Sequence, residues 1–317
     1  MRESLLALVG VVLLAQGSVA ADNLQYFEMT EDHWGEPIVV SLYAPDKKTA
    51  EVATRAAFER IRALAGRYSE RVPESDVSKL NKAAGDKPVT VDESVYQAID
   101  HGQKMGRRTN GAFDITGGPL VALWADDKEP TEKEVAEAKK QIGHDKIVLD
   151  PQATSVHLPA KGMRVDLNGM IKGHIADEAL RAMQTHGIRQ ASLQIGRDVV
   201  VGEAPPGADG WVFTIEPAAG EAAPTEVAIK NTALATSGDL IIDPRTGKQI
   251  EGVQVSVIAK HAMTADALAT VIPVLGPRKG LDLVESTPFA AAKITVEEPD
   301  GKVQVITSRR WKEAKGE

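Results

Sequence analysis

The 317-residue chain contains no cysteine, which excludes a disulfide framework, a thiolate metal site and a lipid-acylated cysteine. It has no excess of positive charge either: the formal net charge is -8, whereas binding to nucleic-acid phosphates needs a basic face. After residue 20, no apolar stretch is long enough to span a membrane. The sequence also has no internal repeat and no low-complexity linker, which favours a single globular body. The negative net charge indicates that this body binds no nucleic acid.

The first 20 residues have the composition of a secretory signal peptide. Arg2 provides a short basic start, residues 5–15 form an apolar run, and residues 17–20 supply small side chains before a cleavage point at Ala21. An apolar run of about eleven residues is too short to anchor the chain in a bilayer. We therefore expect a signal peptide at residues 1–20 and a single domain at residues 21–317, exported as a soluble periplasmic protein that is not a lipoprotein.

Residues 262–270, near the C-terminal end, are mostly small and have helix-compatible spacing. Asp266 and Thr270 stand four residues apart, which places a carboxylate and a hydroxyl on the same face of a helix. Oxygen donors suit a hard cation such as Mg2+, which usually completes its ligand shell with substrate phosphates. The alternative is an alanine-rich packing helix in which Asp266 caps the first turn.

Residues 164–173 predict a short strand, a glycine-flanked turn and a helix that ends at Gly187. Lys172 and the backbone N–H groups at the start of this helix suit a phosphate group. The segment is not a Walker sequence, because the spacing differs and no Ser or Thr follows the lysine. A plain strand–helix junction with a solvated lysine explains the same pattern.

Two further polar segments, residues 73–81 and 110–120, could contact a ligand. The first contains serines and Asn81, which could cap a helical turn or hydrogen-bond a polar ligand. The second combines two adjacent glycines and a proline with Asp114 and Thr116, which predicts a tight turn whose backbone a ligand can approach closely.

Apolar periodicity predicts an α+β body with mixed or antiparallel sheets, packed helices and two intimately joined lobes. Helices are expected through residues 53–64 to a stop at Gly66, from an N-cap at Asp92, and from a capping box of Thr131 and Glu134. Strands are expected at residues 37–43, 190–195, 198–201, 211–216, 226–230, 232–236 and 253–260, with hairpins at 146–158 and around 299–301.

Taken together, seven groups of motifs resemble the ApbE family, the FAD:protein FMN transferases. The resemblance extends from about residue 29 to residue 305, and its specificity comes from the shared order of motifs that are weak individually. They are Tyr68-Ser69 with Ser75, Ser78 and Leu80-Asn81; Gly111-Ala112-Phe113-Asp114 with Thr116 and Gly118-Pro119-Leu120; Val165-Asp166-Leu167 with Gly169 and Lys172-Gly173; Ala176-Asp177; Ala235-Thr236-Ser237-Gly238; Asp243-Pro244 with Thr246-Gly247; and Ala265-Asp266-Ala267-Leu268-Ala269-Thr270.

The resemblance implies an ApbE-like, T-fold-like body that transfers FMN from FAD to a Ser or Thr hydroxyl of a partner protein and releases AMP. The partner would be an exported flavoprotein subunit of a redox complex, and Mg2+ the cofactor. Asp266, Thr270 and a backbone carbonyl near Ile171 would hold the metal, with Lys172 as the fixed cation beside it. The FAD pocket would be lined by Tyr68, Ser78, Asn81, Asp114, Thr116, Asp177, Thr236 and Ser237.

The sequence departs from the family pattern near the end of the Thr-Ser-Gly-Asp motif. Family members usually have a longer loop there, followed by a histidine, whereas here Leu240 follows Asp239 directly. Leucine has no proton to exchange, so Asp243 or His261 would have to assist the acceptor hydroxyl. Arg197 also replaces a usual glycine, which could hinder a close backbone approach or add a phosphate contact.

Two other functions are compatible with these residues. A Mg2+-dependent FAD pyrophosphatase, which releases FMN and AMP, would need the metal residues but no site for an acceptor protein. A non-catalytic FAD-binding accessory protein of a respiratory complex would need the pocket alone.

Overall fold

The computed structural model describes residues 23–33, 35–70, 72–124, 129–238, 240–298 and 300–314. The expected signal peptide lies outside these ranges, as does Pro299 at the tip of the expected C-terminal hairpin. Within the described ranges, no helix has the length and apolar character needed to cross a membrane.

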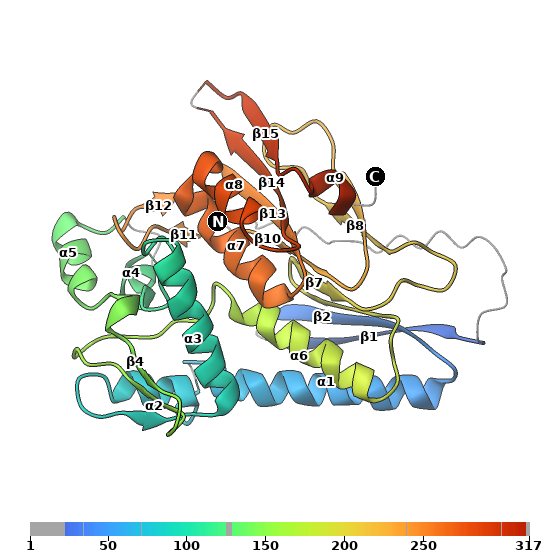
Figure 1. Ribbon diagram of the computed structural model, residues 1–317, viewed down its shortest axis with the longest axis horizontal. Helices are drawn as coiled ribbons and strands as arrows, with labels where there is room; N and C mark the ends of the chain where they lie inside the picture. Colours follow the sequence, from blue (N-terminus) through green and yellow to red (C-terminus); the bar gives the residue numbers. More distant parts are fainter. Residues whose placement is uncertain are drawn as a thin grey trace.

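An antiparallel sheet, eight-stranded within the described residues, is the centre of the larger lobe (Figure 1). The antiparallel α+β architecture expected from the sequence is thereby confirmed. The middle strands are almost entirely buried, and β7 and β10 are accordingly mostly apolar, whereas β6 alternates apolar and polar residues. In spatial order the strands are β1 (Gln25–His33), β2 (Glu36–Ala44), β6 (Ala191–Ile195), β7 (Asp198–Val201), β10 (Ala233–Thr236), β13 (Val253–Ala259), β14 (Ala291–Glu297) and β15 (Val303–Thr307).

Different layers cover the two faces of this sheet. One face packs against four helices and forms the main hydrophobic core with them. The other face packs against a hairpin and a short C-terminal helix through Val199, Leu234, Trp211 and Trp311. The four helices are α1 (Lys47–Tyr68), α6 (Ile171–Thr185), α7 (Ala262–Leu275) and α8 (Pro277–Glu285); the second layer is β8 (Trp211–Ile215), β9 (Thr225–Ile229) and α9 (Trp311–Ala314).

The smaller lobe contains short helices and a small sheet, at the lower left in Figure 1. Ile99 of its central helix belongs to the same core cluster as the large sheet, so the lobes are joined through continuous apolar packing. The lobe consists of α2 (Asp76–Lys82), α3 (Glu93–Arg108), α4 (Gly118–Leu123), α5 (Glu132–Lys140), a 3-10 turn (His144–Lys146) and the strands β3 (Val89–Thr90), β5 (Ser155–His157) and β4 (Val148–Asp150). A hairpin of β11 (Ile241–Ile242) and β12 (Gln249–Ile250) lies beside it.

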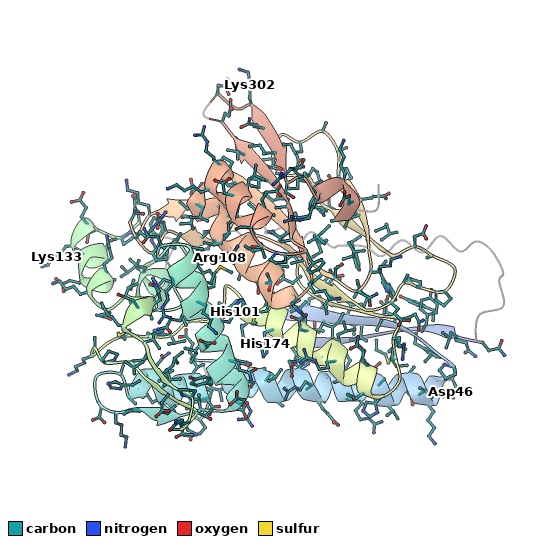
Figure 2. All side chains as sticks on the ribbon, viewed as in Figure 1. Asp46, His101, Arg108, Lys133, His174 and Lys302 are labelled. Carbon is teal, nitrogen blue, oxygen red and sulfur yellow. The ribbon has the colours of Figure 1, made fainter. Side chains whose placement is uncertain are left out.

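Polar side chains lie over the outside of the fold, and some lie within it (Figure 2). Asp46, at the outer end of α1, caps this helix by accepting the N–H of Thr49 at 2.8 Å. His101 of α3 and His174 of α6 lie in the interior, and burial lowers the pKa of His174 to about 4. Both imidazoles are therefore neutral groups of the interior at pH 7.

The helix starts expected from capping signals are confirmed. Asp92 accepts the N–H of Ser94 at the start of α3, and Thr131 and Glu134 form a complete capping box at the start of α5. The stop expected at Gly66 is wrong: α1 continues to Tyr68, because that residue extends the buried stripe of the helix.

The strand expected before the glycine turn of residues 164–173 is also wrong. The described backbone of residues 164–170 is irregular. The side-chain amide of Asn81 donates to the carbonyl of Val165 at 3.0 Å and accepts its N–H at 2.8 Å. Asn81 thus makes the backbone hydrogen bonds that a neighbouring strand would otherwise make.

Helices α6 and α7 meet with little space between their N-terminal ends. A Cβ atom at Gly173 would lie 2.2 Å from the carbonyl oxygen of Ala262. Asp177, one turn further along α6, accepts the N–H groups of Ala262 and Met263 at 2.9 and 3.1 Å. The residue at the N-cap of α7, His261, makes no side-chain cap. Asp177 thus caps α7 from another helix and fixes the two helix starts relative to each other.

We predict that Gly173→Ala destabilises the protein by roughly 1–3 kcal/mol, because the new methyl group would overlap the Ala262 backbone. Urea unfolding followed by circular dichroism measures the effect. The control is Gly66→Ala in α1, where a Cβ meets nothing within 4 Å. That change should stabilise the helix by about 0.5–1 kcal/mol. Equal stability of Gly173→Ala and the wild type would contradict the close helix contact.

Candidate functional site

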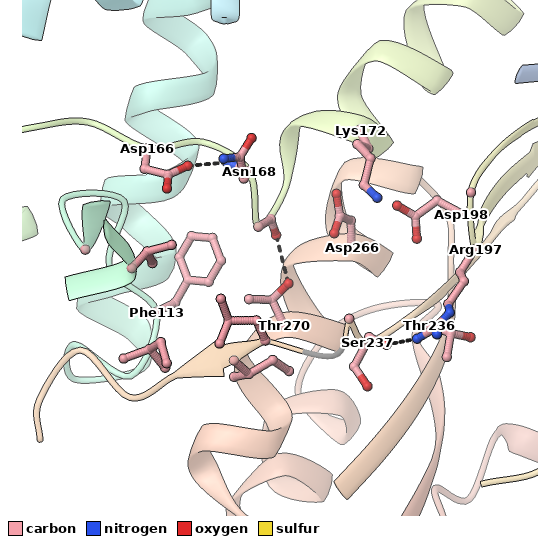
Figure 3. A pocket seen from close by; sticks show the side chains of 18 of the residues that line it. Phe113, Asp166, Asn168, Lys172, Arg197, Asp198, Thr236, Ser237, Asp266 and Thr270 are labelled. Atoms are coloured by element: carbon pink, nitrogen blue, oxygen red, sulfur yellow. Dashed lines mark hydrogen bonds between the residues drawn. The ribbon is translucent and has the colours of Figure 1, made fainter. Parts of the chain in front are cut away.

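A cavity of about 760 Å³ lies between the smaller lobe, the start of α6, one face of α7 and the ends of the central strands (Figure 3). This volume lies within the range of small-molecule sites, roughly 300–1,000 Å³. Its wall combines apolar side chains with carboxylates, cations and hydroxyls. Six of the residues that the sequence indicated line it: Asp114, Lys172, Thr236, Ser237, Asp266 and Thr270.

Asp266 and Thr270 face the cavity from successive turns of α7, as their spacing predicts. Asp266 Oδ2 accepts the N–H of Gly173 at 3.2 Å, and Thr270 Oγ1 donates to the carbonyl of Gly169 at 3.1 Å. Asp266 is thus a cavity residue in the second turn, and the alternative of a helix cap is wrong. The carbonyl beside Thr270 belongs to Gly169 rather than to Ile171, whose side chain is buried in the core.

The carboxyl group of Asp266 is buried, with only 7% of the residue exposed. Burial raises its pKa to about 6, although the N–H of Gly173 and the charge of Lys172 both favour the ionised form. A carboxylate in this position gains from any cation that enters the cavity.

Asp198 is a second buried carboxylate of the cavity, and the sequence analysis missed it. It begins β7, and Figure 3 shows its side chain directed toward Lys172 and Asp266. Burial raises its pKa well above the usual value; the charge of Asp266 adds to this effect, and that of Lys172 opposes it. The signal available in the sequence was an aspartate that opens an otherwise apolar strand, where a charge needs a partner.

Lys172 is the second residue of α6, and its Nζ lies 3.6 Å from Glu36 Oε2 at the start of β2. Glu36 also lines the cavity and was missed by the sequence analysis. Its charge raises the pKa of Asp198 further. One end of the cavity therefore brings three carboxylates and an ammonium group together.

A polar wall of the cavity is formed by the ends of β7 and β10, and β13 supports it. Arg197 Nη1 donates to the carbonyl of Ser237 at 3.1 Å. The hydroxyl of Ser237 accepts the N–H of Val255 at 3.0 Å, and the hydroxyls of Thr236 and Ser256 are 2.9 Å apart. Arg197 is thus fixed along the wall, which permits a contact with an anionic ligand.

The opposite wall carries Phe113 and Asp166 (Figure 3). Asp166 accepts the N–H of Asn168 at 2.9 Å, and burial raises the pKa of its carboxyl group. Asp114 also lines the cavity, but its carboxylate accepts hydrogen bonds from Thr116 and His144 and therefore mainly holds this turn together. An aromatic face beside buried polar groups suits a planar heterocycle.

Several residues predicted to bind FAD do not line the cavity but support it. The amide of Asn81 holds the backbone of Val165, and Asp177 caps α7. Ser78 donates to the carbonyl of Glu70 at 2.8 Å, and Thr116 donates to Asp114 at 2.6 Å.

Tyr68 also lies away from the cavity wall. Its ring packs edge-on against His174 with the centroids 5.7 Å apart, and burial raises the pKa of Tyr68 to about 12. Its contacts are therefore those of a packing residue between α1 and α6.

Neither substitute for the missing histidine lines the cavity. Arg245 binds Asp243 through two hydrogen bonds of 2.9 and 3.0 Å. Burial favours protonation of Asp243, but the bonds from Arg245 outweigh it and the net pKa is lowered, which makes a weak base. His261 stands at the N-cap of α7 beside Asp177. Leu240 itself does line the cavity, with 46% of the residue exposed.

Comparisons with known proteins agree with this fold. The model of the ApbE family matches residues 34–293. An FAD:protein FMN transferase of Vibrio cholerae is 26% identical and aligns with 97% of this chain and 98% of its own length, and one of Klebsiella pneumoniae is 30% identical over 71% of each chain. The crystal structure of the ApbE protein of Thermotoga maritima is 27% identical, with a TM-score of 0.81 and coverage of 92% of this chain and 100% of its own.

The buried carboxylates predict a stability that falls as pH rises. An aspartate with a pKa near 3.9 in the unfolded chain and about 6 in the folded protein binds more protons when folded, so the free energy of unfolding decreases across this interval. In chelator-treated buffer at pH 8, Asp266→Asn should be more stable than the wild type by roughly 1–3 kcal/mol. Urea unfolding from pH 4 to pH 8 measures this difference, with Asp86→Asn as the control for an exposed carboxylate. A less stable Asp266→Asn at pH 8 would refute the electrostatic assignment.

Proposed function

Because the chain belongs to the ApbE family, we propose that it is an enzyme that transfers FMN from FAD to a Ser or Thr hydroxyl of a partner protein and releases AMP. Relatives that align with most of the chain are named FAD:protein FMN transferases. The observation that carries the proposal is the cavity itself, a space of about 760 Å³ that Asp266, Thr270 and Lys172 all line.

We further propose Mg2+ as the cofactor, since the donor atoms of the cavity fit this ion. Asp266, Thr270 and the carbonyl of Gly169 offer hard oxygen ligands, and the buried carboxylates lack sufficient positive charge. Within the described residues, no three His, Cys, Asp or Glu side chains form a metal site by themselves. That agrees with Mg2+, which proteins usually bind through one or two carboxylates together with substrate phosphates. When bound, it would neutralise charge on the pyrophosphate of the donor.

The side chains around this site suit the parts of FAD. Lys172 and Arg197 place two cations along the same wall, where they can bind pyrophosphate oxygens. Phe113 and Asp166 on the opposite wall offer an aromatic surface and a polar partner for a ring system. The chain would thus orient the donor through charge at one end of the cavity and through stacking at the other.

The acceptor side of the cavity is apolar at Leu240. Phosphoryl transfer proceeds through a loose transition state in which positioning and electrostatics contribute most of the catalysis. We propose that the enzyme positions the acceptor hydroxyl at Leu240 without a basic side chain there, and that transfer is correspondingly slow. The site of action would be outside the cytoplasm, a proposal that rests on the composition of residues 1–20.

The decisive experiment incubates the protein without residues 1–20 with FAD, Mg2+ and a small flavin-acceptor domain. We expect a fluorescent acceptor band on a gel and AMP on a column. Asp266→Asn should reduce both by roughly 100-fold, because it removes a carboxylate that would hold the Mg2+ ion that neutralises the reacting phosphates. AMP without a labelled acceptor would instead identify an FAD pyrophosphatase, and bound FAD without either product would identify a binding protein.

A histidine at position 240 tests the acceptor side. Leu240→His should raise the rate of acceptor labelling roughly tenfold, because a positioned general base assists removal of the hydroxyl proton. Leu240→Gln is the matched control, since glutamine is polar but cannot take up the proton. The rates are read from the fluorescence of the acceptor band over time. Equal labelling by all three proteins would show that proton removal at this position does not limit transfer.

A further inference from the structure

Lys172 lies against the acidic end of the cavity rather than in open solvent. Its Nζ is 3.6 Å from Glu36 Oε2, and Figure 3 shows its amine directed toward Asp198 and Asp266. The three carboxylates come from β2, β7 and α7, while Lys172 comes from the first turn of α6. Two strands and one helix thus direct negative charge at one ammonium group.

We propose that Lys172 is the resident counter-ion of the cation site. In the nucleotide-free protein its ammonium group neutralises Asp198, Asp266 and Glu36; it leaves these carboxylates when Mg2+ binds and then contacts the pyrophosphate of the donor. This inference rests on the proposed function, because it requires Mg2+ at Asp266.

The side chain of Lys172 is suited to such an exchange. A lysine ammonium is a compact point charge on a flexible stem, and 38% of this side chain is exposed, so it has room to turn. Like charges repel strongly at contact distance in a buried site, so an ammonium group and a divalent cation cannot both remain against the same carboxylates. The start of α6 favours anions, which places the released ammonium beside a donor phosphate.

Two opposite effects on binding follow from this exchange. Lys172 weakens the binding of Mg2+ to the nucleotide-free protein, because the metal must displace it. The same residue strengthens the binding of FAD once Mg2+ is present. Mg2+ and FAD therefore favour each other's binding through one side chain.

Calorimetric titration with Mg2+ in the absence of nucleotide tests the inference. We expect Lys172→Met to bind Mg2+ about tenfold more tightly than the wild type, and Asp266→Asn to lose this binding. Lys139→Met removes an equal charge from the exposed face of α5, outside the cavity wall, and should match the wild type. In a second titration, with saturating Mg2+, FAD should bind Lys172→Met about tenfold more weakly.

The possible results distinguish a failure of the inference about Lys172 from a failure of the proposed Mg2+ site. Lys172→Gln provides a second variant with a polar side chain, and circular dichroism checks the fold of each protein. Unchanged or weaker Mg2+ binding in both Lys172 variants, with wild-type binding still dependent on Asp266, overturns the inference and leaves the metal assignment intact. Equal Mg2+ binding by the wild type and Asp266→Asn overturns the metal assignment and the inference with it.

Discussion

The contact between the starts of α6 and α7 determines the geometry of the whole cavity. Gly173 lets the backbones approach, Asp177 caps α7 from α6, and the N–H of Gly173 reaches Asp266. Lys172 sits beside this contact and Thr270 one turn beyond it. Because these interactions involve backbone groups at helix ends, they fix the backbones that carry the charged side chains without a bulky packing residue between the helices.

The buried charges that such a site needs lower the stability of the protein when no ligand is bound. Asp198 and Asp266 are both buried, the charge of Asp266 disfavours ionisation of Asp198, and Lys172 compensates the two carboxylates only in part. A protein selected only for stability would place apolar side chains there. The sheet and the continuous core around the cavity supply the stability that allows this repulsion to persist.

Local sequence patterns predicted the helices well. The roles of side chains whose partners lie far away in the sequence could not be predicted in this way. The spacing of Asp266 and Thr270 fixes their common face, and caps such as Asp92 involve neighbours in the sequence. Asn81 and Asp177, by contrast, bind backbone groups 84 and 85 residues away, so their supporting roles become visible only in the fold. Asp198 was missed for the same reason, since its partners come from other strands and helices.

The order of the strands has a consequence for how the molecule forms. β2, near the start of the described chain, pairs with β6 from its second half, and β10 pairs with β7 and β13. Such non-local pairings close large loops and slow folding. Since the cavity takes residues from β2, β7, β10 and α7, it is completed only after most of the chain has condensed. A partly folded chain therefore lacks part of the cavity wall, and the site exists only in the completed fold.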